Sequence, residues 1–238
     1  MSTNWKLTAL IGSALAIGSL AVALAQPHAA ACATIEYRGL DEVEPGILAS
    51  SDVPIDRKRD FGRLHAAAKR RIADMFGPVR ASPVIVLGST QALRQLFPGS
   101  SSFASTIYVP YRSCVLVGPD GHDVDILAHE HLHAEMHHRV GHWRRLTQIP
   151  TWFDEGVAMQ VDYRARYMWS PHSAAVNSGS VKRWRSRAQF FTGNDAGLTR
   201  HYAMAKEEVR LWLQKRRNLY DFLERIRQGD EFVDLYEE

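Results

Sequence analysis

The segment His129-Glu130-His131-Leu132-His133 fits the pattern H-E-x-x-H. On an α-helix with 3.6 residues per turn, His129 and His133 lie one turn apart on the same face. Two neutral imidazoles in this arrangement can bind one Zn²⁺, and Glu130 lies about 100° further round the helix, beside the open coordination position. His131 points away from the ligand face and is expected to be solvated. The sequence therefore predicts a metal-binding helix over 123–139.

A second segment, over 149–158, reads I-P-T-W-F-D-E-G-V-A and predicts another helix. Pro150 is tolerated in a first helical turn, and Trp152 is expected to pack in the core. Glu155 lies among apolar neighbours, where an unpaired carboxylate is costly unless a metal ion binds it. With Glu155 as third ligand, 22 residues after His133, one tetrahedral position stays open, as in catalytic zinc sites. One Zn²⁺ per chain is expected.

The pair of motifs, H-E-x-x-H followed by W-F-x-E-G-x-A, resembles the gluzincin group of zinc metallopeptidases. It is most similar to the small single-domain members, those with a peptidase MA-like domain, and the likeness extends over roughly residues 55–235. The resemblance implies that His129, His133 and Glu155 are the zinc ligands. It also implies that Glu130 is the general base that takes a proton from the attacking water.

Further positions bear on the chemistry that the resemblance implies. Gluzincins use a downstream Tyr or His as a donor to the oxyanion, and Tyr202 matches this role, with the adjacent His201 as the alternative. A Tyr that only packs an amphipathic helix fits Tyr202 as well. His137 continues the face of His129 and is a rival third ligand, although about 12 Å of helix rise would separate the two. Met159 occupies the position of a thermolysin-type Asp, so no partner for His129 is implied.

The rest of the pattern predicts an α+β fold, with a small mixed sheet packed on the zinc-binding helix and a mainly helical C-terminal half. Helical or strand periodicity supports the following elements: a helix over 60–76, strands over 83–87, 106–109 and 114–117, and helices over 198–215 and 219–226. In metallopeptidases of this type, the strand before the zinc helix is the sheet edge that pairs with an extended peptide. Residues 113–117 are the nearest match for that edge strand.

Residues 1–25 are predicted to be a signal peptide, because Lys6 precedes an apolar run and Ala23-Leu24-Ala25 is a small-x-small cleavage site. Cleavage would leave 26–54 as an N-terminal extension, with one short strand around 34–38, ahead of a metallopeptidase domain over 55–238. The protein would then be periplasmic or secreted. The alternative is a membrane anchor, since the apolar stretch over 7–25 is long enough to span a bilayer.

Composition agrees with export. The formal net charge of +3 is too balanced to indicate an anionic polymer as partner, so the basic cluster at 182–187 is expected to be solvated and no nucleic-acid partner is expected. The chain has two cysteines, Cys32 and Cys114. An oxidising compartment would allow them to form a disulfide that ties the extension to the segment before the zinc helix, and two free thiols are the alternative.

Together these features predict an exported zinc-dependent metallopeptidase that hydrolyses bonds in a peptide or protein substrate. The alternative is a catalytically silent gluzincin-like module that binds zinc or a partner. The presence of Glu130 favours the enzyme, because a pure binding site needs no general base.

Overall fold

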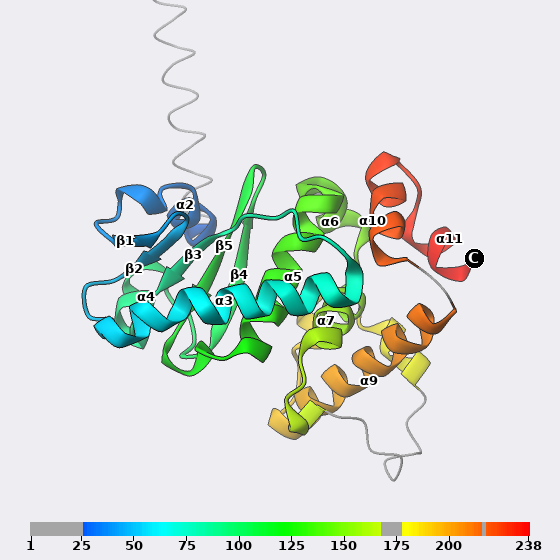
Figure 1. Ribbon diagram of the computed structural model, residues 1–238. Coiled ribbons are helices and arrows are strands. Elements are labelled where there is room, and N and C mark those ends of the chain that lie inside the picture. The colour runs from blue at the N-terminus through cyan, green and yellow to red at the C-terminus, as the bar shows by residue number, and fades with distance from the viewer. Residues whose placement is uncertain (1–25, 168–177, 216–217) are drawn as a thin grey trace, which may run out of the picture.

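The computed structural model describes residues 26–167, 178–215 and 218–238, and in this part of the chain a sheet lies beside a group of helices (Figure 1). The sheet has the strand order β1-β2-β3-β5-β4. Its strands are β1 (Asp41–Glu44), β2 (Ile47–Ala49), β3 (Val84–Leu87), β4 (Ala104–Val109) and β5 (Arg112–Val117). The three inner strands are parallel, and β1 and β4 are antiparallel to their neighbours, so the predicted mixed sheet is confirmed.

Both faces of the sheet are covered, because successive side chains of a strand point to opposite faces. Ile85 and Val115 pack on one face, whereas Val86 and Leu116 pack on the other. The first face is covered by α3 (Ile55–Phe76) and α5 (Val124–Val140), and the second by α2 (Pro27–Ala33) and α4 (Thr90–Leu96). The apolar run that predicted a buried strand over 83–87 reflects this double coverage.

The edge of the sheet next to α5 is β4. The prediction that residues 113–117 form this edge is wrong, because β5 lies between β3 and β4 and pairs with both. The two-residue loop Pro110-Tyr111 joins β4 to β5 as a hairpin, so the strand nearest to α5 in sequence is the inner one. The edge strand therefore presents Thr106 and Tyr108, not residues of β5.

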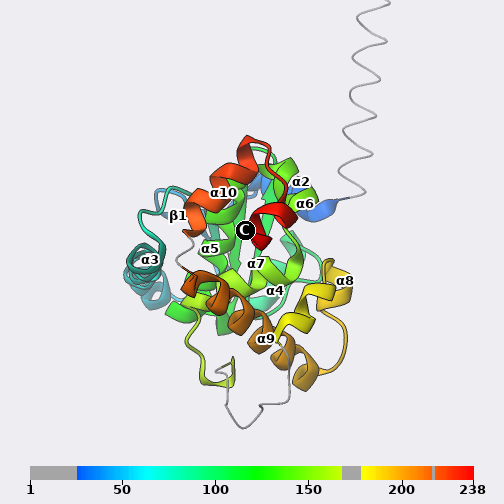
Figure 2. The ribbon, with the colours of Figure 1, turned by 90° about the vertical axis from the view of Figure 1, so that its right-hand side faces the viewer.

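The C-terminal half is mainly helical, as predicted, and α5 connects it to the sheet. In the view from the helical end, α5 and α7 lie in the centre, with α3, α9 and α10 around them (Figure 2). The helices of this half are α6 (His142–Gln148), α7 (Thr151–Ala158), α8 (Arg187–Phe190), α9 (Asp195–Gln214), α10 (Leu219–Gln228) and α11 (Phe232–Glu237). Trp152 is in the core, where its ring meets Phe153, Phe232 and Tyr236 edge to face.

The central position of α5 explains a second error. His131, predicted to be solvated, is 2% exposed, and its Nδ1 lies 3.2 Å from Nε2 of His65 on α3. Burial lowers the pKa of His131 to about 3, so the imidazole stays neutral in the folded protein. A helix with neighbours on every side buries histidines on more than one face.

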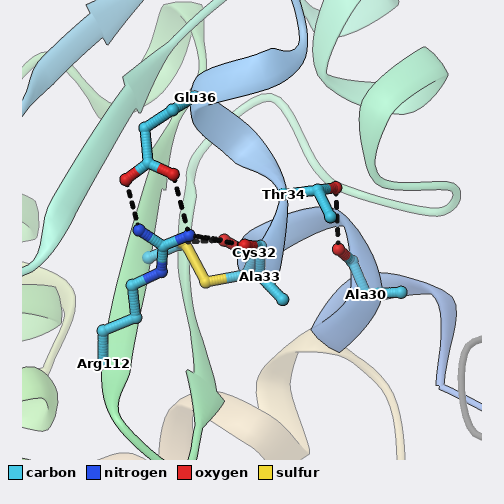
Figure 3. Close-up of a disulfide and its surroundings, with 7 residues drawn as sticks. Ala30, Cys32, Ala33, Thr34, Glu36 and Arg112 are labelled. Carbon is cyan, nitrogen blue, oxygen red and sulfur yellow. Dashed lines mark hydrogen bonds and ion pairs between the residues drawn. A yellow bond between two sulfur atoms is a disulfide. The ribbon is translucent and has the colours of Figure 1, made fainter. Parts of the chain in front are cut away.

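The segment over 26–54 is integrated into the sheet, since it supplies α2, β1 and β2. The strand predicted over 34–38 is absent, and a 3₁₀ turn, η1 (Ile35–Tyr37), occupies that stretch. The predicted Cys32–Cys114 disulfide is confirmed and joins α2 to β5 (Figure 3). Closing a loop of 82 residues stabilises the fold by about 4.5 kcal/mol in the chain-entropy model.

Arg112 reinforces this attachment of α2. Its Nη2 donates to the carbonyl oxygens of Cys32 and Ala33, each at 2.8 Å, and its guanidinium pairs with Glu36 (Figure 3). The predicted signal peptide, residues 1–25, and its alternative anchor over 7–25 lie outside the described residues. Within the described ranges, no helix has both the length and the apolar character required to cross a membrane.

Gly156 lets α7 approach α9 closely, and replacing it by alanine tests this contact. A Cβ at this position would lie 2.5 Å from the Ala205 carbonyl oxygen and 2.7 Å from Cγ2 of Val209. Gly156→Ala is therefore expected to lower the free energy of unfolding by about 1–3 kcal/mol in urea denaturation. Gly197→Ala is the matched control in a helix, because its Cβ would meet only Asn194 Oδ1, at 3.4 Å. Equal stability of the two variants would contradict the close contact.

Candidate metal centre

Three predicted ligands converge between α5 and α7. His129 and His133 come from successive turns of α5, and Glu155 comes from α7. Their Nε2, Nε2 and Oε2 atoms form a triangle with sides of 3.2, 3.4 and 3.4 Å. All three residues are buried, with at most 6% of their surface exposed.

The size of this triangle fits a bound metal ion. Ligand atoms about 2.0–2.2 Å from one tetrahedral Zn²⁺-sized ion lie about 3.3–3.6 Å from one another. The three protein atoms thus match one face of such a tetrahedron, and the fourth corner is left for another ligand. His129, His133 and Glu155 can hold a metal ion together.

The charge of the triad also fits a cation. Burial raises the pKa of Glu155, but the imidazoles of His133 and His129 lower it by more, so the carboxylate is ionised. Two imidazole nitrogens and one carboxylate oxygen are donors that a divalent metal accepts.

A carboxylate lies behind each imidazole, and sequence reasoning missed both. Nδ1 of His133 is 3.1 Å from Oδ1 of Asp154, and Nδ1 of His129 is 3.6 Å from Oδ2 of Asp162. The hydrogen bond to Asp154 favours the tautomer of His133 with hydrogen on Nδ1, which leaves the lone pair of Nε2 for a metal. Asp162 is close to Nδ1 of His129 but beyond hydrogen-bond distance, and that nitrogen has no hydrogen-bond partner among the described residues.

Two arginines hold these carboxylates in place. Nη2 of Arg145 donates to Asp154 and, at 2.8 Å, to the hydroxyl of Tyr108. Nε of Arg164 donates to Oδ1 of Asp162 at 2.9 Å. Burial raises the pKa of both carboxyl groups, but the arginines and the adjacent imidazoles lower it below the ordinary value, so both remain ionised.

Glu130 is positioned by the edge strand. Oγ1 of Thr106 lies 2.7 Å from Oε2 of Glu130 and 3.0 Å from its carbonyl oxygen, and its single proton is donated to one of these two acceptors or shared between them. A single threonine in a strand carries no signal of this role in the sequence. Glu130 itself is half-buried and remains accessible from the adjoining pocket.

Tyr202 shares that pocket, whereas His201 does not. The inner pocket, about 140 Å³ in volume, is lined by His129, Glu130, Tyr202, Tyr167 and Ala104, among others. The Tyr202 ring centroid is 6.3 Å from that of His129. Burial raises the pKa of the Tyr202 hydroxyl well above its ordinary value, and the carboxylates of Glu155 and Glu130 raise it further, so it remains a proton donor.

The two alternative histidines face elsewhere. His201 lies against Trp184, with ring centroids 3.7 Å apart, and its Nδ1 is 2.7 Å from the Phe190 carbonyl oxygen. His137 is one turn beyond His133 on α5, and its Nε2 is 3.3 Å from Nδ1 of His142. Neither alternative belongs to the cluster that could hold a metal ion among the described residues.

A larger hollow, about 690 Å³ in volume, is lined by residues 106–108 of the edge strand and by Asp154, the neighbour of Glu155. We name it the β4 groove. Thr106, Tyr108, Arg145, Asp154, Arg185 and Arg187 contribute to its lining. Thr106 touches Glu130 and Asp154 touches His133, so the groove reaches the residues that surround the metal-binding triad.

Comparison with known proteins adds no relative: no protein-family model, curated protein or solved structure matches this chain.

The ligand set can be tested by metal content. We expect about one divalent ion per chain, and loss of most of it in His129→Ala, His133→Ala or Glu155→Ala, because two protein ligands rarely hold a metal. His137→Ala is the control and should keep its metal. Metal is measured by plasma mass spectrometry after dialysis of the folded proteins. Loss of metal in His137→Ala together with retention in Glu155→Ala would exclude Glu155 as the third ligand.

The carboxylates behind the imidazoles give a separate prediction. Asp154→Asn should weaken metal binding about 10- to 100-fold, since the partner of a ligating histidine fixes its orientation and basicity. Asp162→Asn should have a smaller effect, because its distance to the imidazole is longer. Competition with a chromophoric chelator measures the affinities, and Asp195→Asn on the exposed start of α9 is the control. Unchanged affinity in both buried variants would contradict the assigned role.

Proposed function

We propose that this protein is a zinc-dependent peptidase that hydrolyses peptide bonds with a metal-activated water. The observation that carries the proposal is that three converging ligands leave one position open next to a pocket lined by Glu130 and Tyr202. A structural zinc site has four protein ligands and no such position.

Zinc is the ion that the donor set favours. Two imidazoles and one carboxylate in a tetrahedral arrangement are typical of catalytic zinc sites, whereas Mg²⁺ and Ca²⁺ prefer more oxygen ligands. When bound there, zinc would lower the pKa of a water molecule and polarise a carbonyl group. His129, His133 and Glu155 would hold it.

The chain's own residues would carry the proton and stabilise the developing charge. Glu130, restrained by Thr106, would accept the proton of the attacking water. The Tyr202 hydroxyl, which keeps its proton, would donate a hydrogen bond to the oxyanion that forms at the scissile carbonyl.

The edge strand β4 supports a peptide as the substrate. One side of β4 pairs with β5, and no other strand of the described residues pairs with it. An extended peptide can add to such an edge through main-chain hydrogen bonds, which do not depend on side chains. Thr106, within this strand, would bring the bound backbone next to Glu130.

An exported protein is consistent with the disulfide. Disulfides persist in oxidising compartments, so the Cys32–Cys114 bond fits an extracellular or periplasmic location. Cleavage of the signal peptide after Ala25 is part of the proposal.

Two substitutions separate catalysis from metal binding. Glu130→Gln should retain the metal while turnover falls about 100-fold or more, because the amide cannot accept the proton. Tyr202→Phe should lower kcat about 100- to 1,000-fold with little change in KM. Cleavage of a diverse peptide library is followed by mass spectrometry, alongside metal content.

Control variants show which assigned role is wrong if the expected results are not obtained. Tyr163→Phe makes the same chemical change as Tyr202→Phe at an exposed tyrosine and should retain full activity. Loss of activity in His201→Ala together with a silent Tyr202→Phe would move the donor role to His201. Wild-type protein that holds zinc and cleaves no peptide would support the catalytically silent binding module instead.

A further inference from the structure

We propose that the β4 groove selects peptides that carry an Asp or Glu side chain on one flank of the scissile bond, and that Arg185 and Arg187 bind this side chain. The inference rests on the proposed peptidase function and adds its substrate class. The groove, as defined above, is lined by residues 106–108 of the edge strand and by Asp154, the neighbour of Glu155.

The groove is positively charged because the one carboxylate among its described lining residues already has ion-pair partners. Among the described residues that line it, Asp154 is the only carboxylate, and Arg145 and His133 both contact this carboxylate. The charge of Arg145 is used in the same contact, and its guanidinium lies 3.7 Å over the Tyr108 ring. The charge that remains available belongs to Arg185 and Arg187.

Both arginines are exposed, and neither has an ion-pair partner among the described residues. The ranges outside the description, 1–25, 168–177 and 216–217, contain no Asp or Glu. The guanidinium of Arg187 lies over the Phe191 ring at 4.7 Å, which orients it without neutralising it.

The backbone that carries these arginines is anchored. Ser186 and Gln189 form a capping box at the start of α8, with the Gln189 Oε1 atom 3.0 Å from the backbone nitrogens of Arg185 and Ser186. The Arg185 carbonyl accepts from the backbone nitrogen of Thr151, at 2.8 Å. Thr151 is the first residue of α7, the helix that supplies Glu155, so both guanidinium groups extend from a platform fixed to the metal site.

The position of the groove ties this charge to substrate binding. A peptide paired with Thr106 and Tyr108 would extend from the triad into the groove, with side chains on one face about 6.6 Å apart. A peptide carboxylate there would meet unneutralised guanidinium groups, which bind carboxylates with well-directed hydrogen bonds. A lysine at the same position would be repelled.

The test compares peptides that differ only in Glu, Gln or Lys at each position near the scissile bond. On one flank, kcat/KM should be about three- to tenfold higher for Glu than for Gln, and high salt should reduce the difference. The double variant Arg185→Gln/Arg187→Gln should lose the preference, and Arg185→Glu/Arg187→Glu should favour Lys. Arg183→Gln is the matched control, since Arg183 is an exposed neighbour over Trp184 that does not line the groove.

A binding measurement on the full protein separates this inference from the proposed function. Fluorescence anisotropy of the same labelled peptides reports binding whether or not cleavage occurs. Absence of cleavage with Arg-dependent binding of the Glu peptides would reject the peptidase and keep the acid-selective groove. Equal cleavage of Glu and Gln peptides would overturn the inference and leave the peptidase intact. Equal binding of the two peptides would overturn the inference whether or not cleavage occurs. Tighter binding of a single-stranded oligonucleotide than of any Glu peptide would also overturn it.

Discussion

The structure depends on a buried charge cluster that must be balanced. Glu155, Asp154 and Asp162 are buried carboxylates, and Arg145 and Arg164 are the guanidinium groups that contact two of them. Neutral imidazoles would leave one negative charge in excess, in a place where an uncompensated charge costs several kcal/mol. Without a metal, His133 supplies the missing positive charge: burial lowers its pKa, but the carboxylates of Asp154 and Glu155 raise it well above the ordinary value, so the imidazole carries a proton. A divalent cation at the triad would replace that proton, because a ligating histidine must be neutral. Metal binding would therefore release a proton and depend on pH.

The ligands could be predicted because each has a local signal. His129 and His133 follow from the spacing of one helical turn, and Glu155 is conspicuous as an acid in an apolar helix. The partner carboxylates have weaker signals. Asp162 reaches His129 only because the 3₁₀ turn η3 (Met159–Val161) follows α7, and a sequence spacing cannot specify such a turn.

The wrong predictions share one cause. The position of a strand in the sheet and the burial of a side chain depend on tertiary neighbours, which a local sequence pattern does not specify. The edge strand was misassigned because chain order does not determine sheet order, and a hairpin can place the later strand inside. His131 was misassigned because α5 contacts other elements all round, so that helical periodicity no longer separates buried from exposed positions. The turn over Ile35–Tyr37 belongs to a segment that is organised by the disulfide and by Arg112.

Arg145 connects the edge strand to the candidate metal centre. Its guanidinium contacts Tyr108 on the edge strand and Asp154 behind His133, so one buried side chain joins the strand proposed to bind a peptide backbone to the orientation of a candidate metal ligand. Because Nη2 of Arg145 makes both contacts, a substrate carboxylate could bind it only by breaking a buried ion pair, which is costly. Under the proposed function, discrimination between substrates would then come from exposed groups whose charge is free. The proposed division, with a buried arginine that holds the site and exposed arginines that would meet the ligand, follows from the cost of burying charge.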